Sequence, residues 1–320
     1  MDARETLGGP NGPRIVQWFI DTRPLWPVTK SNARDEVQQL KNVASRALSL
    51  LTEPEQTSVL KYYHLKDAKM SLVSHLLKHF IITKCSIPWS RSTISRDEKG
   101  KPCFKSGPDT DHVILDFNVS HQAGIVSLIA AIGFKGVSVG TDVVCVNERL
   151  QQDYAHISKY GFDDWVDVHA DVLADSEVAF MKSAPIDDRY RGAETVIEKQ
   201  LRRFYAIWCL REAYVKMTGD ALLAPWLKEL EILDVQSPAA KEGIDAVSLE
   251  EGEVIRQFAN YFQGKAVTNV KTELTALGTQ YMIAGSIRIP KEHKDSGVNL
   301  GKWQKLDLER DILCFAEASS

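Results

Sequence analysis

The segment from Glu198 to Thr218 constrains this chain most strongly, because it is predicted to be one long helix that Gly219 ends as a C-terminal cap. At 3.6 residues per turn, Trp208, Glu212 and Lys216 fall on one stripe of that helix. The stripe offers a carboxylate for a metal ion and an ammonium for a phosphate. Taken alone, it is better explained as an i,i+4 surface pair, which stabilises a helix by only about 0.2–0.5 kcal/mol.

Two segments upstream add polar groups at the end or in the middle of predicted strands. Residues 117–122 alternate apolar and polar side chains and bring His121 to a strand end, where a lone histidine is more often structural than functional. Residues 139–144 place Asp142 inside an apolar run, and burying a carboxylate is costly unless it is paired or bound to a metal. A metal ligand and a helix cap are the two explanations for Asp142. Gly140 leaves room there for a backbone or a ligand to approach closely.

Composition excludes several classes of protein. The 320 residues, 44% hydrophobic and 26% charged, are typical of a soluble globular chain, and the net charge of −4 gives no footprint for nucleic acid. The N-terminus lacks the features of a signal peptide, and the longest apolar run, from Gly124 to Phe134, is too short to span a membrane. The five scattered cysteines contain no C-x-x-C pair, which favours reduced thiols in the cytoplasm over disulfides or a zinc site. His75 and His79 lack the intervening pattern of a zinc helix and are expected on a polar helix face.

Periodicity and turn residues predict a mixture of helices and strands. The predicted helices are residues 35–51, 52–63 with a capping box at Thr52, 67–85, 163–173, 175–181 and 198–218. The predicted strands are residues 15–20, 117–121, 125–132, 137–146, 227–235, 266–277 and 281–289. Residues 183–194 are expected to form a polar linker and residues 237–253 a charged loop.

A short internal echo suggests two related halves. Leu65-Lys66-Asp67-Ala68 and Leu210-Arg211-Glu212-Ala213 both follow paired aromatic residues and each lies on a long helix. Coincidence explains so few letters as readily as duplication does. The alternative predicts an N-terminal lobe over residues 14–135, a C-terminal lobe over 136–290, tails at 1–13 and 291–320, and a site between the lobes.

Taken together, the three segments resemble the Sfp-type 4′-phosphopantetheinyl transferases. The signatures of that family are (F/W)N-x-SH, then VG-x-D, then W-x-x-KE-(S/A)-x-x-K, and here they occur in that order from Phe117, from Val139 and from Trp208. Upstream, Ile87-Pro88-Trp89 and Lys99-Gly100-Lys101-Pro102 also match the family. The match extends over roughly residues 60 to 235 and is closest to the stand-alone broad-range enzymes of filamentous fungi.

The resemblance implies a fold and a reaction. The fold would be α+β, with two similar lobes related by a pseudo-two-fold axis. Coenzyme A would donate its phosphopantetheine arm to a serine of a carrier domain and release 3′,5′-ADP. The acceptors would be acyl and peptidyl carrier proteins of polyketide synthases, non-ribosomal peptide synthetases and the aminoadipate reductase of lysine synthesis. Because the paired site would lie within one chain, the interpretation as two related halves predicts a monomer. The reduced thiols predict the cytoplasm, and neither nucleic acid nor a membrane is expected as a partner.

It also implies roles for individual residues. Asp142 and Glu212 would bind Mg²⁺, which prefers oxygen ligands. Lys216 would bind the pyrophosphate and His121 the region of the 3′-phosphate. Glu212, or a water that it holds, would take the serine proton, and a water on the metal or Lys216 are the alternatives. The candidates for the remaining phosphates are Lys66, Arg96, and Lys99 or Lys101.

Two departures from the family pattern affect these assignments. Many members carry a second acid two residues after the aspartate, but this position is Val144, so water, phosphate oxygens or Gln122 would complete the metal shell. The usual lysine before the glutamate is Arg211, which is expected to be tolerated because it lies about 100° around the helix from Glu212. Loss of the acid motivates an alternative function, a non-catalytic module that binds coenzyme A and carrier proteins. A metal-dependent phosphohydrolase is a third possibility.

Overall fold

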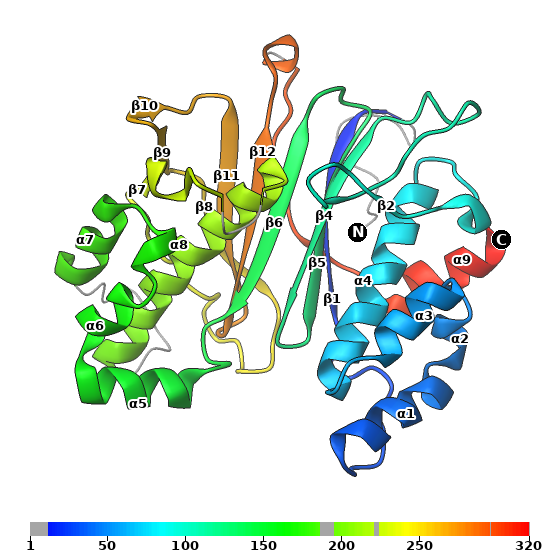
Figure 1. The fold of residues 1–320 in the computed structure, drawn as a ribbon, viewed down its shortest axis with the longest axis horizontal. Coiled ribbons are helices and arrows are strands. Elements are labelled where there is room, and N and C mark those ends of the chain that lie inside the picture. The colour runs from blue at the N-terminus through cyan, green and yellow to red at the C-terminus, as the bar shows by residue number, and fades with distance from the viewer. Residues whose placement is uncertain (1–11, 186–194, 221–223, 295, 320) are drawn as a thin grey trace. The chain divides into compact units, whose positions relative to one another are not determined.

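The computed structural model describes residues 12–185, 195–220, 224–294 and 296–319 (Figure 1). Most of the expected tail 1–13 and of the expected linker 183–194 lies outside the described residues. The chain folds as two compact units, Met1–Val137 together with Gly301–Ser320, and Ser138–Leu300. Among the described residues, no helix is long and apolar enough to cross a membrane.

The first unit packs helices on a four-stranded sheet with the order β13-β1-β5-β4. β1, β5 and β4 pair antiparallel, and β13 runs parallel to β1. Its strands are β1 (Arg14–Asp21), β2 (Ser95–Arg96), β3 (Pro102–Cys103), β4 (Leu115–Gln122), β5 (Ile125–Ile132) and β13 (Gln304–Lys305). Its helices are α1 (Ala33–Val43), α2 (Ser45–Leu48), α3 (Glu53–Leu60), α4 (Leu65–Thr83), the short η1 (Trp89–Arg91), the π-helical η5 (Leu308–Leu313) and α9 (Cys314–Ala318).

The second unit places α8 on the antiparallel sheet β6-β12-β11-β8 and adds the small sheet β10-β9-β7 (Figure 1). Its strands are β6 (Ser138–Cys145), β7 (Leu230–Leu233), β8 (Glu251–Ile255), β9 (Ala259–Phe262), β10 (Lys265–Ala266), β11 (Val270–Leu277) and β12 (Tyr281–Arg288). Its helices are α5 (Leu150–Tyr160), α6 (Phe162–Asp167), α7 (Asp175–Ser183), α8 (Val196–Thr218) and the short η2 (Ala170–Val172), η3 (Leu227–Glu229) and η4 (Lys291–His293). Helices and sheets are thus combined in both units, which is the predicted α+β class.

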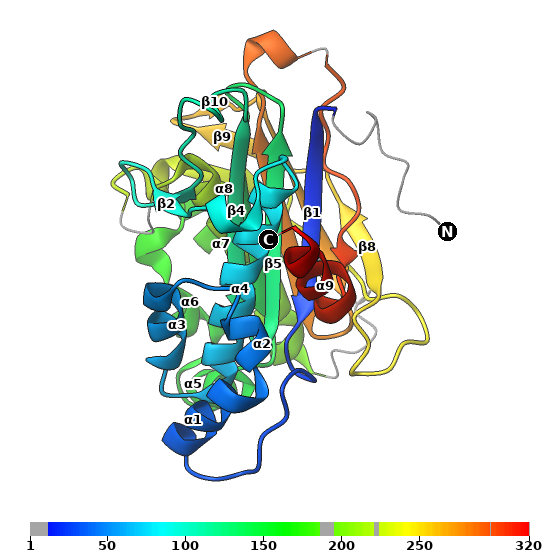
Figure 2. The ribbon, with the colours of Figure 1, turned by 90° about the vertical axis from the view of Figure 1, so that its right-hand side faces the viewer.

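Several sequence predictions differ from the structure in identifiable ways. The helix expected over 35–51 is divided at Ala44, and the one expected over 163–173 is divided between α6 and η2. α5 was not predicted, because it is mostly polar and buries only Asp153 and Ile157. The expected tail after residue 290 contains β13, η5 and α9, which lie with the first unit (Figure 2). Its apolar residues Leu308, Leu313 and Ile312 are part of that unit's hydrophobic core.

A half-buried carboxylate, that of Glu55, joins α3 to α4 in the first unit. The capping box at Thr52 forms as predicted, with the Thr52 N–H donating to Glu55 at 3.0 Å. The same carboxylate lies 3.1 Å from Nε2 of His79 and 3.3 Å from Nδ1 of His75. The two histidines therefore face α3 rather than forming a polar surface. Among the described residues, no group of three or more His, Cys, Asp or Glu side chains is arranged to hold a metal.

We expect this cluster to make folding stability fall as the pH is lowered. Burial alone would raise the pKa of Glu55, but the close contacts with His75 and His79 outweigh it and hold that pKa well below its usual range. Burial also lowers the pKa of His75, which Glu55 offsets only in part. Folding lowers both pKa values, so the unfolded chain binds more protons than the folded protein does. The stabilisation present at neutral pH is therefore lost as the pH falls, first below about pH 6.5, the unfolded pKa of histidine, and then below about pH 4.3, the unfolded pKa of glutamate.

Urea unfolding at several pH values measures this effect, and each unit of pKa difference corresponds to about 1.4 kcal/mol. Glu55→Gln should flatten the acidic side of the profile, whereas Glu53→Gln, at the exposed start of the same helix, should not. An unchanged slope in Glu55→Gln would contradict the assignment.

Candidate functional site

The long helix α8 begins and ends where local chemistry dictates. Thr195 caps its N-terminus, since the Thr195 hydroxyl accepts from the Glu198 N–H at 3.2 Å and the Thr195 N–H donates to the Glu198 carboxylate at 2.9 Å. Gly219 ends it in the left-handed conformation, at φ 77°. The prediction of one helix ending at Gly219 is therefore confirmed.

Gly140 lets α8 lie directly on β6. A Cβ atom at this position would be 2.2 Å from the carbonyl oxygen of Ala213 and 2.3 Å from the backbone nitrogen of Met217. The sequence left open whether a backbone or a ligand approaches Gly140, and the structure shows that it is the backbone of α8. This close packing places the C-terminal half of α8 over the strand that carries Asp142.

Three predicted site residues meet where α8 crosses β6. Nζ of Lys216 lies 2.6 Å from Oδ1 of Asp142 and 3.8 Å from Oε2 of Glu212. The two acidic oxygens are therefore no farther apart than the sum of these distances, although the residues are 70 positions apart in the chain. Only 8% of the Asp142 side chain and 13% of the Glu212 side chain are exposed, so both carboxylates are largely removed from water.

The cluster changes the acidity of its members. Burial raises the pKa of Glu212 to about 7; the nearby carboxylate of Asp142 adds to the shift and the ammonium of Lys216 opposes it. Burial alone would lower the pKa of Lys216, but Asp142 and Glu212 together outweigh it and raise that pKa above its usual value. Two carboxylates this close together need a cation to stay ionised. Lys216 balances one of the two negative charges, so one negative charge is left for a further cation.

Val144, where many family members carry a second acid, lies on the same strand as Asp142. Side chains two residues apart point to the same face of a strand, so Val144 shares the face of Asp142. Val144 is 2% exposed and belongs to an apolar cluster that includes Leu210 and Met282. A carboxylate at this position would be buried among apolar side chains.

In the first unit, His121 and Gln122 stand at the end of the β4–β5 hairpin. They pair with Val126 and Ile125 across a two-residue turn, Ala123-Gly124, in which both residues have positive φ. His121 is exposed and Gln122 is half-buried. The predicted strand end is confirmed, and the roles of both residues stay predictions.

The four predicted phosphate-binding cations lie on two elements of the first unit. Lys66 is exposed in the first turn of α4. Arg96, Lys99 and Lys101 lie on the β2–β3 hairpin, where Arg96 donates to the Gly100 carbonyl at 2.7 Å.

Lys101 differs from its neighbours because its side chain is buried. Its Nζ contacts both carboxylate oxygens of Asp116, at 2.7 and 2.9 Å. Lys99 is exposed in the turn, and the carboxylate of Asp97 accepts from the backbone N–H groups of Lys99 and Lys101. The hairpin is thus a preformed basic turn, and Lys101 would have to be shared with Asp116 to reach a phosphate.

Arg211 is paired with Glu177, a partner that the sequence did not reveal. Nη1 of Arg211 lies 2.8 and 2.9 Å from the two oxygens of Glu177 and also donates to the Leu230 carbonyl. The same carboxylate accepts from the backbone N–H groups of Ala174 and Ile232, each at 3.0 Å. This buried pair ties α7 and β7 to α8 one residue before Glu212. The only sequence signal was an acid within an amphipathic helix, which is too common to be informative.

Two family models and several known proteins match this chain. A family model described as 4′-phosphopantetheinyl transferase, N-terminal, matches residues 38–133, and one described as the 4′-phosphopantetheinyl transferase superfamily matches residues 138–262. The chain is 43% identical to 4′-phosphopantetheinyl transferase 1 of Fusarium mangiferae over 97% of this chain and 98% of that protein.

Relatives of lower identity are also named as phosphopantetheinyl transferases. Identity is 35% to 4′-phosphopantetheinyl transferase NpgA of Emericella nidulans, over 97% of this chain and 96% of that protein. It is 21% to the human L-aminoadipate-semialdehyde dehydrogenase-phosphopantetheinyl transferase, over 78% of this chain and 71% of that protein. The three ordered motifs, the carboxylate pair at Lys216 and these matches together identify the chain as a member of the 4′-phosphopantetheinyl transferase family.

Proposed function

We propose that this protein transfers the 4′-phosphopantetheine arm of coenzyme A to a serine hydroxyl of acyl and peptidyl carrier domains and releases 3′,5′-ADP. The serine oxygen forms a bond to the phosphorus that bears the pantetheine arm, and the bond from that phosphorus to the departing ADP breaks. The observation that carries the proposal is the cluster of Asp142, Glu212 and Lys216, in which Asp142 is buried and the other two side chains are half-buried. The names of the relatives, which include aminoadipate-semialdehyde dehydrogenase-phosphopantetheinyl transferases, support carrier domains as acceptors.

The donor set of the cluster fits a magnesium ion. Asp142 offers a buried carboxylate and Glu212 a half-buried one, and their crowding already requires a cation. Mg²⁺ in such sites is usually held by one or two carboxylates, with water and substrate phosphates completing the shell. We assign Asp142 and Glu212 as its ligands and Gln122 as a candidate third ligand. When bound, the ion neutralises charge on the pyrophosphate.

The remaining roles follow from charge and acidity. Lys216 stays protonated because its pKa is raised, so it presents a full positive charge to the pyrophosphate. Glu212, with a pKa of about 7 in the absence of other ligands, is the candidate to accept the serine proton. His121 would contact the region of the 3′-phosphate, and Lys66, Arg96, Lys99 and Lys101 the other phosphates. In this reaction, positioning and charge neutralisation supply most of the catalysis.

We further propose a pseudo-two-fold relation between the two lobes, and a monomeric, cytoplasmic enzyme without nucleic-acid or membrane partners. All five cysteines are among the described residues and all are free thiols, as expected in a reducing compartment. Size-exclusion chromatography with light scattering tests the monomer.

Incubation with coenzyme A, Mg²⁺ and an apo carrier domain tests the reaction, with the mass of the carrier as the readout. A gain of one phosphopantetheine supports the proposal. Binding of both substrates without a gain would favour a non-catalytic binding module, and breakdown of coenzyme A without carrier would favour a phosphohydrolase. Either of those results would refute the transferase.

Lys216→Ala is expected to raise the KM for coenzyme A about tenfold or more, because a charged hydrogen bond to a phosphate is worth about 1.5–3 kcal/mol. The KM for the carrier domain should not change. Lys182→Ala serves as a control, since Lys182 pairs with Asp167 near the surface, away from the cluster. A change confined to the KM for the carrier would contradict the placement of Lys216 at the pyrophosphate.

A further inference from the structure

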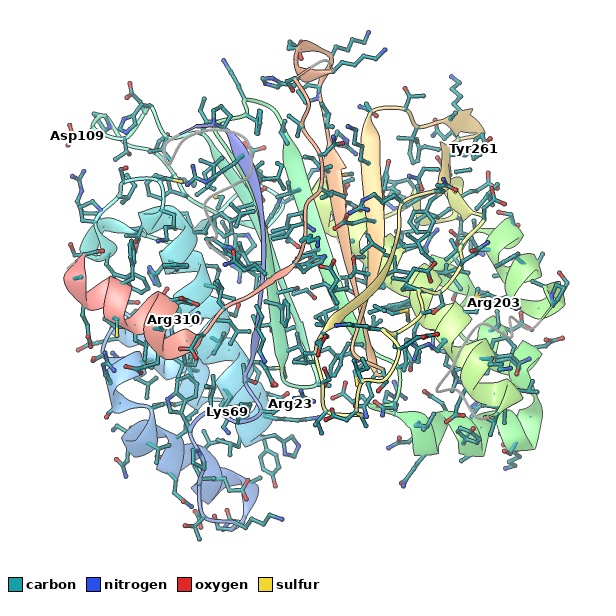
Figure 3. All side chains as sticks on the ribbon, turned by 180° about the vertical axis from the view of Figure 1, so that it is seen from behind. Arg23, Lys69, Asp109, Arg203, Tyr261 and Arg310 are labelled. Carbon is teal, nitrogen blue, oxygen red and sulfur yellow. The ribbon has the colours of Figure 1, made fainter. Side chains whose placement is uncertain are left out.

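A cavity of about 480 Å³ lies at one edge of the second unit's large sheet. It is lined by residues of β9 and β11, by Arg256 and Phe258 between β8 and β9, and by residues near the end of the unit. Tyr261, labelled in Figure 3, marks β9 beside it. This volume is in the range of binding sites for ligands, and the catalytic cluster does not account for it.

The cavity follows a stretch of β11 that has a strand on one side only. β8 pairs with β11 at Leu274, Thr275 and Leu277, and no described strand continues this pairing along residues 270–273. The Ile289 N–H donates to the Asn269 carbonyl at 2.8 Å, so this antiparallel pair is a hydrogen-bonded one.

Hydrogen-bonded pairs alternate along an antiparallel ladder. Lys271 and Glu273 therefore direct their backbone groups at β12, and Val270 and Thr272 direct theirs away from it. Val270 and Thr272 both line the cavity. The cavity thus contains backbone donors and acceptors in the arrangement that pairs with an added strand.

A buried side chain in the cavity wall points to a ligand independently. Asn260 on β9 is 8% exposed, and its Oδ1 has no hydrogen-bond partner in the described part of the chain. A buried carbonyl oxygen without a hydrogen-bond partner is destabilising, and native structures rarely keep one without a purpose. Asn260 also lines the cavity, where a main-chain amide could satisfy it.

The charges around the cavity favour an acidic ligand. Arg256 is paired with the fully buried Glu273 at 3.0 Å. Nζ of Lys271 is held by two neutral groups, the Val298 carbonyl at 2.9 Å and Oδ1 of Asn299 at 2.6 Å. Two cations and one carboxylate leave the cavity with an excess positive charge, which complements an acidic segment.

The cavity and the catalytic cluster share one sheet. Asp142 pairs with Ala284, and Ala284 pairs with Leu274, so the three residues form one row across β6, β12 and β11. Thr272 is two residues along from Leu274 and on the same face as Asp142. With strands ~4.8 Å apart and a rise of ~3.4 Å per residue, the backbones of Asp142 and Thr272 are about 12 Å apart.

We propose that the edge of β11 at residues 270–273 binds a short, extended, acidic segment of the polypeptide that bears the modified serine. The segment pairs with the backbone of Val270 and Thr272, hydrogen-bonds to Asn260, and places its acid at Lys271. This inference rests on the proposed transferase function. It gives the enzyme a second contact with its protein substrate, separate from the reacting atoms.

The test compares three substrates: an apo carrier domain trimmed to its folded part, the same domain with acidic flanking segments, and the same domain with those acids replaced by amides. With the unaltered enzyme, the acidic flanks should lower the KM for the carrier about tenfold, and the neutralised flanks much less. Rising salt should reduce the difference, because the contact is electrostatic. Equal KM values for all three substrates would overturn the inference but leave the transferase function intact, whereas loss of transfer to all three would overturn that function.

Lys271→Glu and Lys271→Gln locate the contact. Lys271 is exposed, so both variants should fold. Lys271→Glu should abolish the advantage of the acidic flanks and Lys271→Gln should reduce it, with kcat, the KM for coenzyme A and the KM for the trimmed carrier unchanged. The matched control is Lys291→Glu, an exposed charge reversal outside the cavity lining. Equal effects of Lys271→Glu on trimmed and flanked carriers would contradict the proposal.

Discussion

Replacing Asp142 with asparagine is expected to reduce transfer by at least a hundredfold and to leave the protein folded. The carboxylate of Asp142 is one of two that meet at Lys216, and it supplies half of the negative charge available to a divalent cation. Asparagine keeps the shape of the side chain and a hydrogen bond to Lys216, while Glu212 still balances the ammonium. The loss should therefore appear in catalysis rather than in stability. Glu212→Gln should have a similar effect, because it removes the other carboxylate and the candidate base.

The mass of the carrier after single-turnover incubation gives the rate, measured over a range of Mg²⁺ concentrations. Thermal unfolding of each variant shows whether the fold is retained. Asp164→Asn is a suitable control, because Asp164 is an exposed acid that pairs with His156 outside the cluster. Near-normal turnover in Asp142→Asn or Glu212→Gln would refute the assignment of these two residues to the metal.

Arg211→Met is expected to destabilise the second unit by about 3–5 kcal/mol, because it leaves the carboxylate of Glu177 buried without its cation. Burial raises the pKa of Glu177, and the guanidinium of Arg211 opposes that shift. Both side chains are almost fully buried, so water cannot replace the lost contact. Removing both charges in the double variant Glu177→Leu/Arg211→Met should recover much of the loss, since a pair of apolar residues needs no partner.

Urea unfolding of the two single variants and the double variant measures the coupling between the residues. Arg211→Lys tests the residue that the family usually carries here. A lysine can contact Glu177 but cannot also reach the Leu227 and Leu230 carbonyls in the forked geometry of arginine, so a smaller loss is expected. A change within about 0.5 kcal/mol in Arg211→Met would contradict the role given to this pair.

The strongest sequence signals were those that local chemistry fixes. α8 was predicted from its C-terminal glycine, and α3 from the capping box at Thr52, because caps satisfy backbone groups with neighbours only three or four residues away. β5 was predicted at its observed bounds, Ile125–Ile132, because it is an uninterrupted apolar run between turn residues. α5 escaped prediction because most of its residues are polar and its buried residues are Asp153 and Ile157.

The short C-terminal elements escaped prediction for a different reason. β13, η5 and α9 are only two to six residues long and are stabilised by contacts with residues almost 300 positions earlier, such as the pairing of Gln304 with Trp18. No local pattern reports such a contact. The same holds for Arg211, because its helical position was evident from the sequence but Glu177 lies 34 residues away on another helix.

The sequence by itself determined the family, through three ordered motifs, and named the residue types suited to bind a cation and a phosphate. Only the tertiary structure brought Asp142 and Glu212 to one ammonium, placed Val144 in the apolar core, and formed the cavity along β11. The reason is physical. A sequence motif shows which chemical group is required at each position. Burial, crowding of charges and unpaired strand edges depend on segments that meet only after the chain has folded.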